Sequence, residues 1–251
     1  MKDKILLISG CSHTSGSEID GTEDSVYNRQ HSFGGIIARS LNRRPVNIAQ
    51  VAMSNSGIAR SIMNWFKYQY NAETMDVNVL IAWTESTRLE TPRAKRAYYE
   101  SSAMSCDWFD PSSNDYYRVN MGFFGGPGED ESMFKFFHEF MARYPEMSEI
   151  NSANYIIQLQ NYLKLLNVPY LMCNVMHMFG NPPCRHVQQY LEFIDHSKYY
   201  KMLDNNASFY TKYKNLGFVN EKAKYWHHGE GPHKAYATEL VKFIGENNVF
   251  S

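Results

Sequence analysis

The stretch Ile5-Leu6-Leu7-Ile8-Ser9-Gly10-Cys11-Ser12 decides the fold of this chain. Four consecutive apolar residues near the N-terminus predict a buried strand, and Gly10 with the polar residues after it predicts where that strand ends. The pattern places Ser12 just beyond the carboxyl end of the strand. Because open α/β sheets carry their chemistry at this edge, Ser12 is a candidate nucleophile.

Working outward, three further segments have the composition of buried strands, namely residues 45–49, 77–83 and 168–175. The apolar spacing between them predicts helices over residues 31–41, 57–70, 151–166 and 232–244, the third of them capped by Ser152. Strands that alternate with helices and are apolar on both faces indicate a parallel sheet covered on both sides. We therefore expect an α/β fold, a three-layer α/β/α sandwich with a short parallel sheet of flavodoxin-like type, in which residues 1–251 form a single domain.

Residues 85–147 interrupt this alternation. They are rich in Tyr, Phe, Asp, Ser and Gly and contain one short helical pattern, at residues 133–143. A connection of this length inside a compact α/β domain more often serves a function than merely links two elements. We expect a long insertion after the third strand, lying over the active edge of the sheet.

Composition and charge exclude several classes of protein. The net charge is −1, which gives no field to attract nucleic acid or an anionic membrane. No apolar run reaches membrane-spanning length, and the N-terminus leads into a strand rather than a signal peptide, so we expect a cytoplasmic protein with no membrane partner. The four cysteines and nine histidines lack the spacing of a zinc or redox site, so we expect neither a metal nor another cofactor.

Three other polar segments lie where a serine hydrolase needs them. Residues 47–55 leave the second strand, residues 82–85 leave the third, and residues 226–237 lead into the last helix. A serine after the first strand, polar turns after the next two and a histidine before the last helix follow the motif order of the SGNH (GDSL-like) hydrolases, which this chain resembles as a divergent member. The resemblance implies an SGNH-hydrolase type of fold and a serine-dependent esterase or acyl hydrolase. Its substrate would be a small-molecule or carbohydrate ester, such as a carbohydrate O-acetyl ester or a small acyl ester.

The resemblance also implies roles for individual residues. Ser12 is the nucleophile, although the family's Gly-Asp-Ser-Leu reads Gly10-Cys11-Ser12-His13 here. The backbone N–H groups of Ser12 and Ala52 would bind the oxyanion. Thr84 stands where the family has an asparagine and would be a third donor. Losing one such donor typically costs about 100-fold to 1000-fold in rate.

The last motif makes His227 the base, with His228 as the alternative and His233 at the start of the helix. The family's acid, three residues before the base, corresponds to Lys224, which cannot orient an imidazole or stabilise its cation. A backbone carbonyl or a carboxylate such as Glu230 is expected to take its place.

Other polar residues at the same edge have structural interpretations beside functional ones. His13 is expected to be a turn residue rather than a second base, and at least one of Ser54 and Asn55 is expected to cap the following helix. Arg88 and Glu90 are expected to form an ion pair that frames the site, with substrate contact as the alternative.

Two other functions stay open. Because the family's asparagine and aspartate are absent, the chain could be a catalytically degenerate SGNH-fold protein that serves as a binding or structural subunit. The Gly-Cys-Ser-x-Thr opening resembles sequences of bacteria and their viruses, so this alternative includes a virion-associated subunit. A nucleotide-binding flavodoxin-like protein is the weaker alternative, since the first loop lacks a Gly-x-Gly-x-x-Gly or Walker pattern. The oligomeric state is not predicted.

Overall fold

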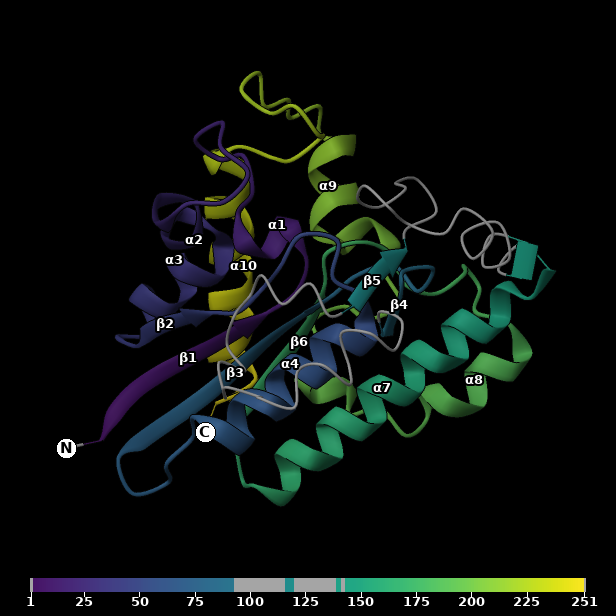
Figure 1. Ribbon diagram of the computed structural model, residues 1–251, viewed down its shortest axis with the longest axis horizontal. Helices are drawn as coiled ribbons and strands as arrows, with labels where there is room; N and C mark the ends of the chain where they lie inside the picture. The colour runs from purple at the N-terminus through teal and green to yellow at the C-terminus, as the bar shows by residue number, and fades with distance from the viewer. Residues whose placement is uncertain (1, 93–115, 120–138, 141–142, 251) are drawn as a thin grey trace, which may run out of the picture.

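The computed structural model describes residues 2–92, 116–119, 139–140 and 143–250. Its main sheet has four parallel strands in the order β2-β1-β3-β6 (Figure 1). The strands are β1 (Asp3–Ser9), β2 (Arg44–Asn47), β3 (Met75–Trp83) and β6 (Tyr170–Asn174). With β1 between β2 and β3, the order is that of doubly wound folds, whose ligand sites lie at the carboxyl ends of the strands.

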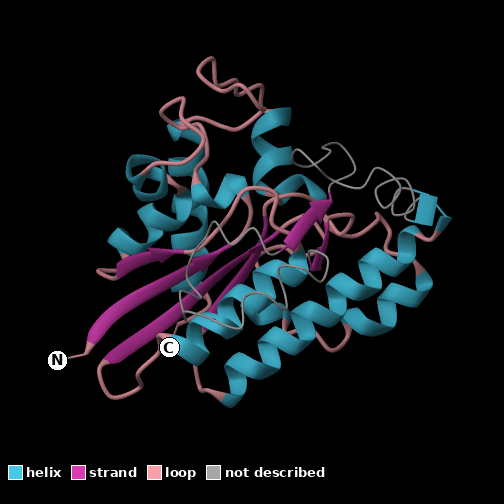
Figure 2. Cartoon of the chain, in the orientation of Figure 1, coloured by secondary structure: helices cyan, strands magenta, loops and turns pink. Residues whose placement is uncertain are grey.

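Helices cover both faces of this sheet (Figures 1 and 2). Strand residues alternate between two cores, so that Leu7 and Val79 belong to one while Ile8 and Leu80 belong to the other. The first core is completed by α4 (Asn55–Tyr68), α7 (Pro145–Leu165) and α8 (Arg185–Leu191). The second is completed by α3 (Phe33–Ser40), α9 (Phe209–Asn215) and α10 (Glu230–Glu246). The predicted three-layer α/β/α arrangement with a short parallel sheet is confirmed.

Shorter elements complete the described part of the chain. They are α1 (Ser12–Ser15), α2 (Val26–His31), the 3₁₀ turns η1 (His196–Lys198) and η2 (Asn205–Ala207), and an antiparallel pair formed by β4 (Leu89–Pro92) and β5 (Tyr116–Val119). The β4–β5 pair lies within the insertion and was not predicted. The predicted helix at residues 133–143 falls mostly outside the described residues.

Each of the other predicted helices is present, but its boundaries differ from the prediction. The helix expected over residues 31–41 is α3, which begins two residues later because Ser32 is extended and caps it by accepting the Gly35 N–H at 3.2 Å. The helix expected over residues 151–166, with Ser152 as its cap, begins at Pro145, a residue type favoured at the first helical position. The predicted cap of α4 is confirmed for Ser54, whose hydroxyl accepts the Gly57 N–H at 3.2 Å.

Candidate active site

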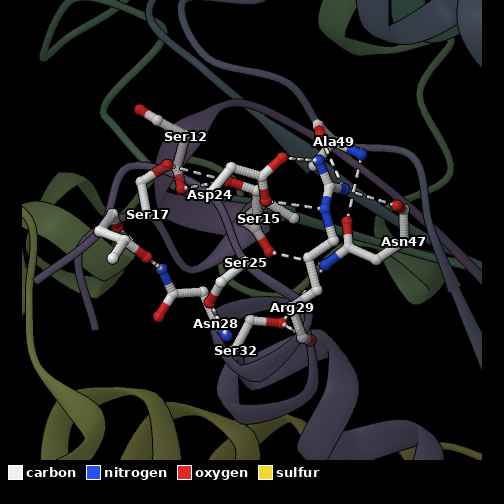
Figure 3. Close-up of polar contacts among 12 residues, drawn as sticks. Ser12, Ser15, Ser17, Asp24, Ser25, Asn28, Arg29, Ser32, Asn47 and Ala49 are labelled. Atoms are coloured by element: carbon white, nitrogen blue, oxygen red, sulfur yellow. Dashed lines mark hydrogen bonds and ion pairs between the residues drawn. The ribbon is translucent and has the colours of Figure 1, made fainter. Parts of the chain in front are cut away.

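Ser12 begins α1 on a tightly fixed turn after β1. The turn starts at Gly10, where an added Cβ would lie 2.8 Å from the carbonyl oxygen of Ala82. The Ser12 carbonyl accepts hydrogen bonds from the Ser15 hydroxyl at 2.8 Å and the Ser17 N–H at 3.0 Å. The hydroxyl of Ser12 points away from these contacts (Figure 3). Hydrogen bonds within the turn thus fix the main chain of Ser12, and its hydroxyl is not used in them.

A carboxylate that no sequence pattern pointed to lies against His227. Nδ1 of His227 is 2.6 Å from Oε2 of Glu18, whose side chain is only 4% exposed. The same carboxylate accepts the backbone N–H of Lys224, at 2.8 Å to Oε1, and that of Tyr225, at 3.0 Å to Oε2. Because water is largely excluded, these hydrogen bonds are stronger than surface ones. Glu18 therefore fixes both the imidazole of His227 and the backbone that precedes it.

Glu230, the carboxylate expected beside His227, lies elsewhere, so that expectation is wrong. As the first residue of α10, Glu230 contacts α2, where Oε1 is 2.8 Å from Nδ1 of His31, and it also pairs with Lys234 at 3.0 Å. Lys224 contributes only its main-chain N–H, which helps to hold the carboxylate of Glu18. The sequence gives little sign of this pairing, because the two partners are 209 residues apart and no family motif covers residue 18.

His13 joins the turn of Ser12 to His227. It is 7% exposed, and its ring centroid lies 4.7 Å from that of His227 and 6.3 Å from that of His228. It was expected to be a turn residue and is instead a buried member of α1. Nε2 of His228 is 3.2 Å from the Tyr210 carbonyl, so this ring is held by the main chain and not by a carboxylate.

The histidines of this cluster are kept neutral at neutral pH. Burial lowers the pKa of His227, the carboxylate of Glu18 opposes this, and the charge of Arg88 lowers it again. Burial and the neighbouring histidines hold the pKa of His13 well below its ordinary value. The pKa of His228 is also lowered, chiefly by burial. A neutral imidazole is the form that can accept a proton as a general base.

Ala52 has the backbone conformation that a glycine would adopt. Its φ is 57°, in the left-handed region, where a residue with a Cβ is strained by about 1–2 kcal/mol. The SGNH resemblance places the family's glycine at this position. The substitution therefore preserves the conformation, and the surrounding loop must hold it in place.

Thr84 and Asn55 form a clamp at the end of β3. The Thr84 N–H donates to Asn55 Oδ1 at 3.0 Å, and Asn55 Nδ2 donates to the Thr84 carbonyl at 3.1 Å. The same amide nitrogen donates to the hydroxyl of Ser152 at 3.0 Å, so Asn55 joins β3, α4 and α7. The hydroxyl of Thr84 is buried and has no hydrogen-bond partner among the described residues.

The predicted ion pair between Arg88 and Glu90 is wrong. Nε of Arg88 donates to Glu85 Oε1 at 2.8 Å, three residues earlier, whereas Glu90 on β4 accepts from Arg60 of α4 at 2.7 Å. Although burial opposes the charged form of Arg88, the nearby Cys11 and Glu85 raise its pKa. Arg88 is thus a buried cation beside the residue that precedes Ser12.

The part of the chain that the structure describes shows neither a metal-binding cluster nor a membrane-spanning helix. Within it, no three His, Cys, Asp or Glu side chains gather in an arrangement that could hold a metal ion. None of the helices described is long and apolar enough to cross a membrane.

Comparison with known proteins finds similarity at the level of structure. No family model matches the sequence, and no curated protein matches it. A carbohydrate esterase family 2 enzyme with a carbohydrate-binding domain, from Corynascus thermopiles (Myceliophthora fergusii), aligns at a TM-score of 0.49 and 10% identity over 98% of this chain and 66% of its own. The psychrotrophic esterase EstA of Pseudoalteromonas sp. aligns at 0.46 and 10% identity over 97% and 98% of the two chains. A lipolytic protein of the G-D-S-L family from Veillonella parvula aligns at 0.40 and 13% identity over 95% and 96%.

These similarities concern the backbone. The backbone is similar in outline to those of two esterases and of a lipolytic protein of the G-D-S-L family. It spans slightly less than two thirds of the length of the family 2 enzyme, which carries a further domain. At such low identity the activity of a neighbour does not transfer, and the chemistry has to be argued from this chain's own residues.

Proposed function

We propose that this chain is a serine hydrolase of ester bonds in which Ser12 is the nucleophile and His227, oriented by Glu18, is the base. The observation that carries the proposal is the 2.6 Å contact between His227 Nδ1 and Glu18 Oε2. When Nδ1–H donates to the carboxylate, Nε2 is left without a proton and can accept one. Among the described residues His228 is held by the Tyr210 carbonyl and by no carboxylate, which favours His227 as the base.

The reaction follows from these roles. Ser12 Oγ attacks the ester carbonyl carbon while its proton passes to Nε2 of His227. The carbonyl electron pair moves onto the oxygen, which the N–H groups of Ser12 and Ala52 stabilise, with the hydroxyl of Thr84 as the third proposed donor. The C–O bond then breaks, and the alcohol leaves with the proton from His227. Water, activated by the same imidazole, hydrolyses the acyl-serine.

Glu18 contributes in both halves of the reaction. Each transfer creates an imidazolium, and a carboxylate at hydrogen-bond distance stabilises that cation and keeps the ring from turning. Burial makes the effect larger, since charges interact more strongly where water is excluded. The low pKa of His227 keeps the base unprotonated before the reaction begins.

The proposed substrates are carbohydrate O-acetyl esters or small acyl esters. Trp226, which directly precedes His227, is 85% exposed, and Tyr225 is 42% exposed. The leaving alcohol takes its proton from His227, so it comes close to this part of the loop. Exposed aromatic rings at that point suit an alcohol with an apolar face, such as a sugar ring.

The test is hydrolysis of an aryl acetate by the parent, by Ser12→Ala and by Ser40→Ala as a control on the exposed end of α3. We expect the loss of the nucleophile to reduce kcat by about 10,000-fold or more and the control to match the parent. Turnover by Ser12→Ala equal to that of the parent would refute the mechanism.

A catalytically degenerate binding subunit is the second candidate. The observation in its favour is the clamp at Thr84, because the Asn55 amide is engaged with Thr84 and Ser152 while the hydroxyl of Thr84 is buried. A folded parent that neither hydrolyses aryl acetates nor reacts with a fluorophosphonate serine probe would favour this candidate over the hydrolase.

A further inference from the structure

The loop that carries Ala52 needs support from outside. Its left-handed φ of 57° at a residue with a Cβ is maintained only where neighbouring contacts hold it. One internal contact is the Met53 N–H to the Gln50 carbonyl at 3.3 Å, and the Gln50 N–H reaches the Gly10 carbonyl at 3.1 Å. The first part of the loop, at the end of β2, is held by a side chain of helix α2.

That side chain is Arg29 of α2 (Figure 3). Its Nη1 donates to the carbonyl of Asn47 at 2.7 Å and to that of Ala49 at 3.2 Å. Its other nitrogens donate to the carboxylate of Asp24, Nε to Oδ1 at 2.9 Å and Nη2 to Oδ2 at 2.7 Å. One guanidinium therefore connects the loop before Ala52 with the loop before α2.

Asn47 extends the support toward the nucleophile's turn. Its Nδ2 donates to the Thr14 carbonyl of α1 at 3.1 Å and lies 3.4 Å from the hydroxyl of Ser32. Its Oδ1 accepts the Ala49 N–H at 3.1 Å. The residue whose carbonyl Arg29 holds is thus itself bonded to the helix that begins with Ser12.

Asp24 belongs to residues 18–25, the loop that begins with Glu18. This loop is fixed to α2 by Asn28, which accepts the Asp20 N–H at 3.0 Å and donates to the Thr22 carbonyl at 2.9 Å. Ser25 caps α2 by accepting the Asn28 N–H at 3.0 Å. The anchor of Arg29 at Asp24 is therefore built into the loop that carries the carboxylate of the base.

We propose that Arg29 is a positioning residue that fixes the position of the Ala52 loop relative to the Glu18 loop. The backbone N–H of Ala52 and the imidazole of His227 can then act on the same ester group. The inference rests on the proposed function, because it concerns the relative placement of two parts of that site. Arg29 makes no contact with the reacting atoms in this role.

Arginine is suited to this role by its geometry. Its planar fork presents five N–H donors in fixed directions, and here they serve two carboxylate oxygens and two backbone carbonyls at once. A lysine in its place has one nitrogen on a flexible stem and cannot reach all four acceptors. The Arg29–Asp24 ion pair itself is partly exposed, at 23% and 47%, so the backbone contacts carry most of the effect.

The test compares Arg29→Met with Arg39→Met, a matched control. Arg39 is on the adjacent helix α3 and also donates to a backbone carbonyl, that of Gln30, but it contacts neither loop. Kinetics are expressed per active site titrated with a fluorophosphonate. Because small displacements of reacting groups cost up to about 100-fold, we expect Arg29→Met to lower kcat by roughly 10-fold to 100-fold and to leave KM little changed. The control should match the parent.

Ala52→Gly provides a rescue that a merely structural arginine would not allow. Glycine adopts a positive φ without strain, so the loop should depend less on Arg29. We therefore expect Ala52→Gly to raise kcat far more in the Arg29→Met background than in the parent, a non-additive result. The inference would be overturned if Ala52→Gly changed kcat by the same factor in both backgrounds. A kcat of Arg29→Met equal to that of the parent would also overturn it.

Two further measurements cover the remaining outcomes. If Arg29→Met does not fold, Arg29→Lys replaces it with the same rescue and the same criteria. Backbone hydrogen exchange of residues 47–53, which needs no catalysis, should be faster in the Arg29 variant than in Arg39→Met.

If Ser12→Ala is as active as the parent, the proposed function fails, and the catalytic role of Arg29 fails with it. If Ser12→Ala is inactive but the Arg29 variant shows neither effect, only this inference fails.

Discussion

Replacing Glu18 by glutamine should disable the base without changing the shape of the site. The amide oxygen of glutamine can satisfy the backbone N–H of Lys224 only from the position of Oε1, which lies 2.8 Å from that nitrogen. The amide NH₂ then occupies the position of Oε2, 2.6 Å from Nδ1 of His227. A donor there forces Nδ1 to accept, so the proton moves to Nε2 and the imidazole can no longer take one from Ser12.

The size of the loss follows from this change of tautomer. Comparable acid-to-amide replacements in Ser–His–acid hydrolases cost on the order of 10,000-fold in kcat, and we expect about 1000-fold to 10,000-fold here. The glutamine also loses the Tyr225 N–H bond to Oε2, 3.0 Å in the parent, and keeps only the longer one at the position of Oε1, 3.3 Å. That loss should lower the free energy of unfolding by about 1–3 kcal/mol. The protein should therefore remain folded while its activity falls.

The assay is kcat for an aryl acetate at neutral pH, with thermal unfolding measured on the same samples. Glu23→Gln is the matched control, because it removes an acidic charge from the same loop, and the charge of Glu23 is the smallest of the causes that act on the pKa of His227. A folded Glu18→Gln variant whose kcat is within about fivefold of the parent would refute the role of Glu18, because that is far below the cost of a lost tautomer.

Two pH dependences follow from the buried histidines. Because burial lowers the pKa of His227, kcat/KM should stay high as the pH falls below 6.5 and drop only at a lower pH, where the base becomes protonated; an acid limb above 6.5 would contradict this. Burial also lowers the pKa of His233 to about 3, and its Nδ1 accepts the Phe33 N–H at 3.1 Å. As the pH falls, His233 therefore becomes protonated at a higher pH in the unfolded chain than in the folded one. The part of the free energy of unfolding that comes from neutral His233 is fully present above pH 6.5 and is lost as the pH falls toward 3. At pH 5 the loss from His233 is about 2 kcal/mol. In His233→Asn, whose Oδ1 can replace Nδ1 as acceptor, the Tm should depend less on pH, and an unchanged slope would argue against this linkage.

The core of the fold was predictable because local patterns decide it. The apolar runs at β1 and β3 are buried on both faces, so composition alone identifies them as central strands of a covered parallel sheet. The cap at Ser54 was also predictable, since its contact with Gly57 lies within three residues. The start of α3 was predicted two residues early, although serine, here Ser32, is a residue type favoured as a helix cap.

The candidate site was predictable only in part, because its pairings are long-range. Ser12 and the His227 segment follow a motif order that the sequence displays. The carboxylate does not, since Glu18 meets His227 through a loop whose path depends on contacts such as those of Asn220 and Lys224. Arg88 and Glu90 were paired by proximity in sequence, yet Arg88 pairs with Glu85 in its own turn and Glu90 pairs with Arg60 of α4.

The reactivity of Ser12 tests the central claim most directly. The measurement is reaction of the folded protein with a fluorophosphonate, followed by mass spectrometry of the digested product. We predict one phosphonyl group per chain, bound to Ser12, and a strongly reduced rate in both His227→Ala and Glu18→Gln. Failure of the parent to react, or a phosphonyl group on any residue other than Ser12, would contradict the account.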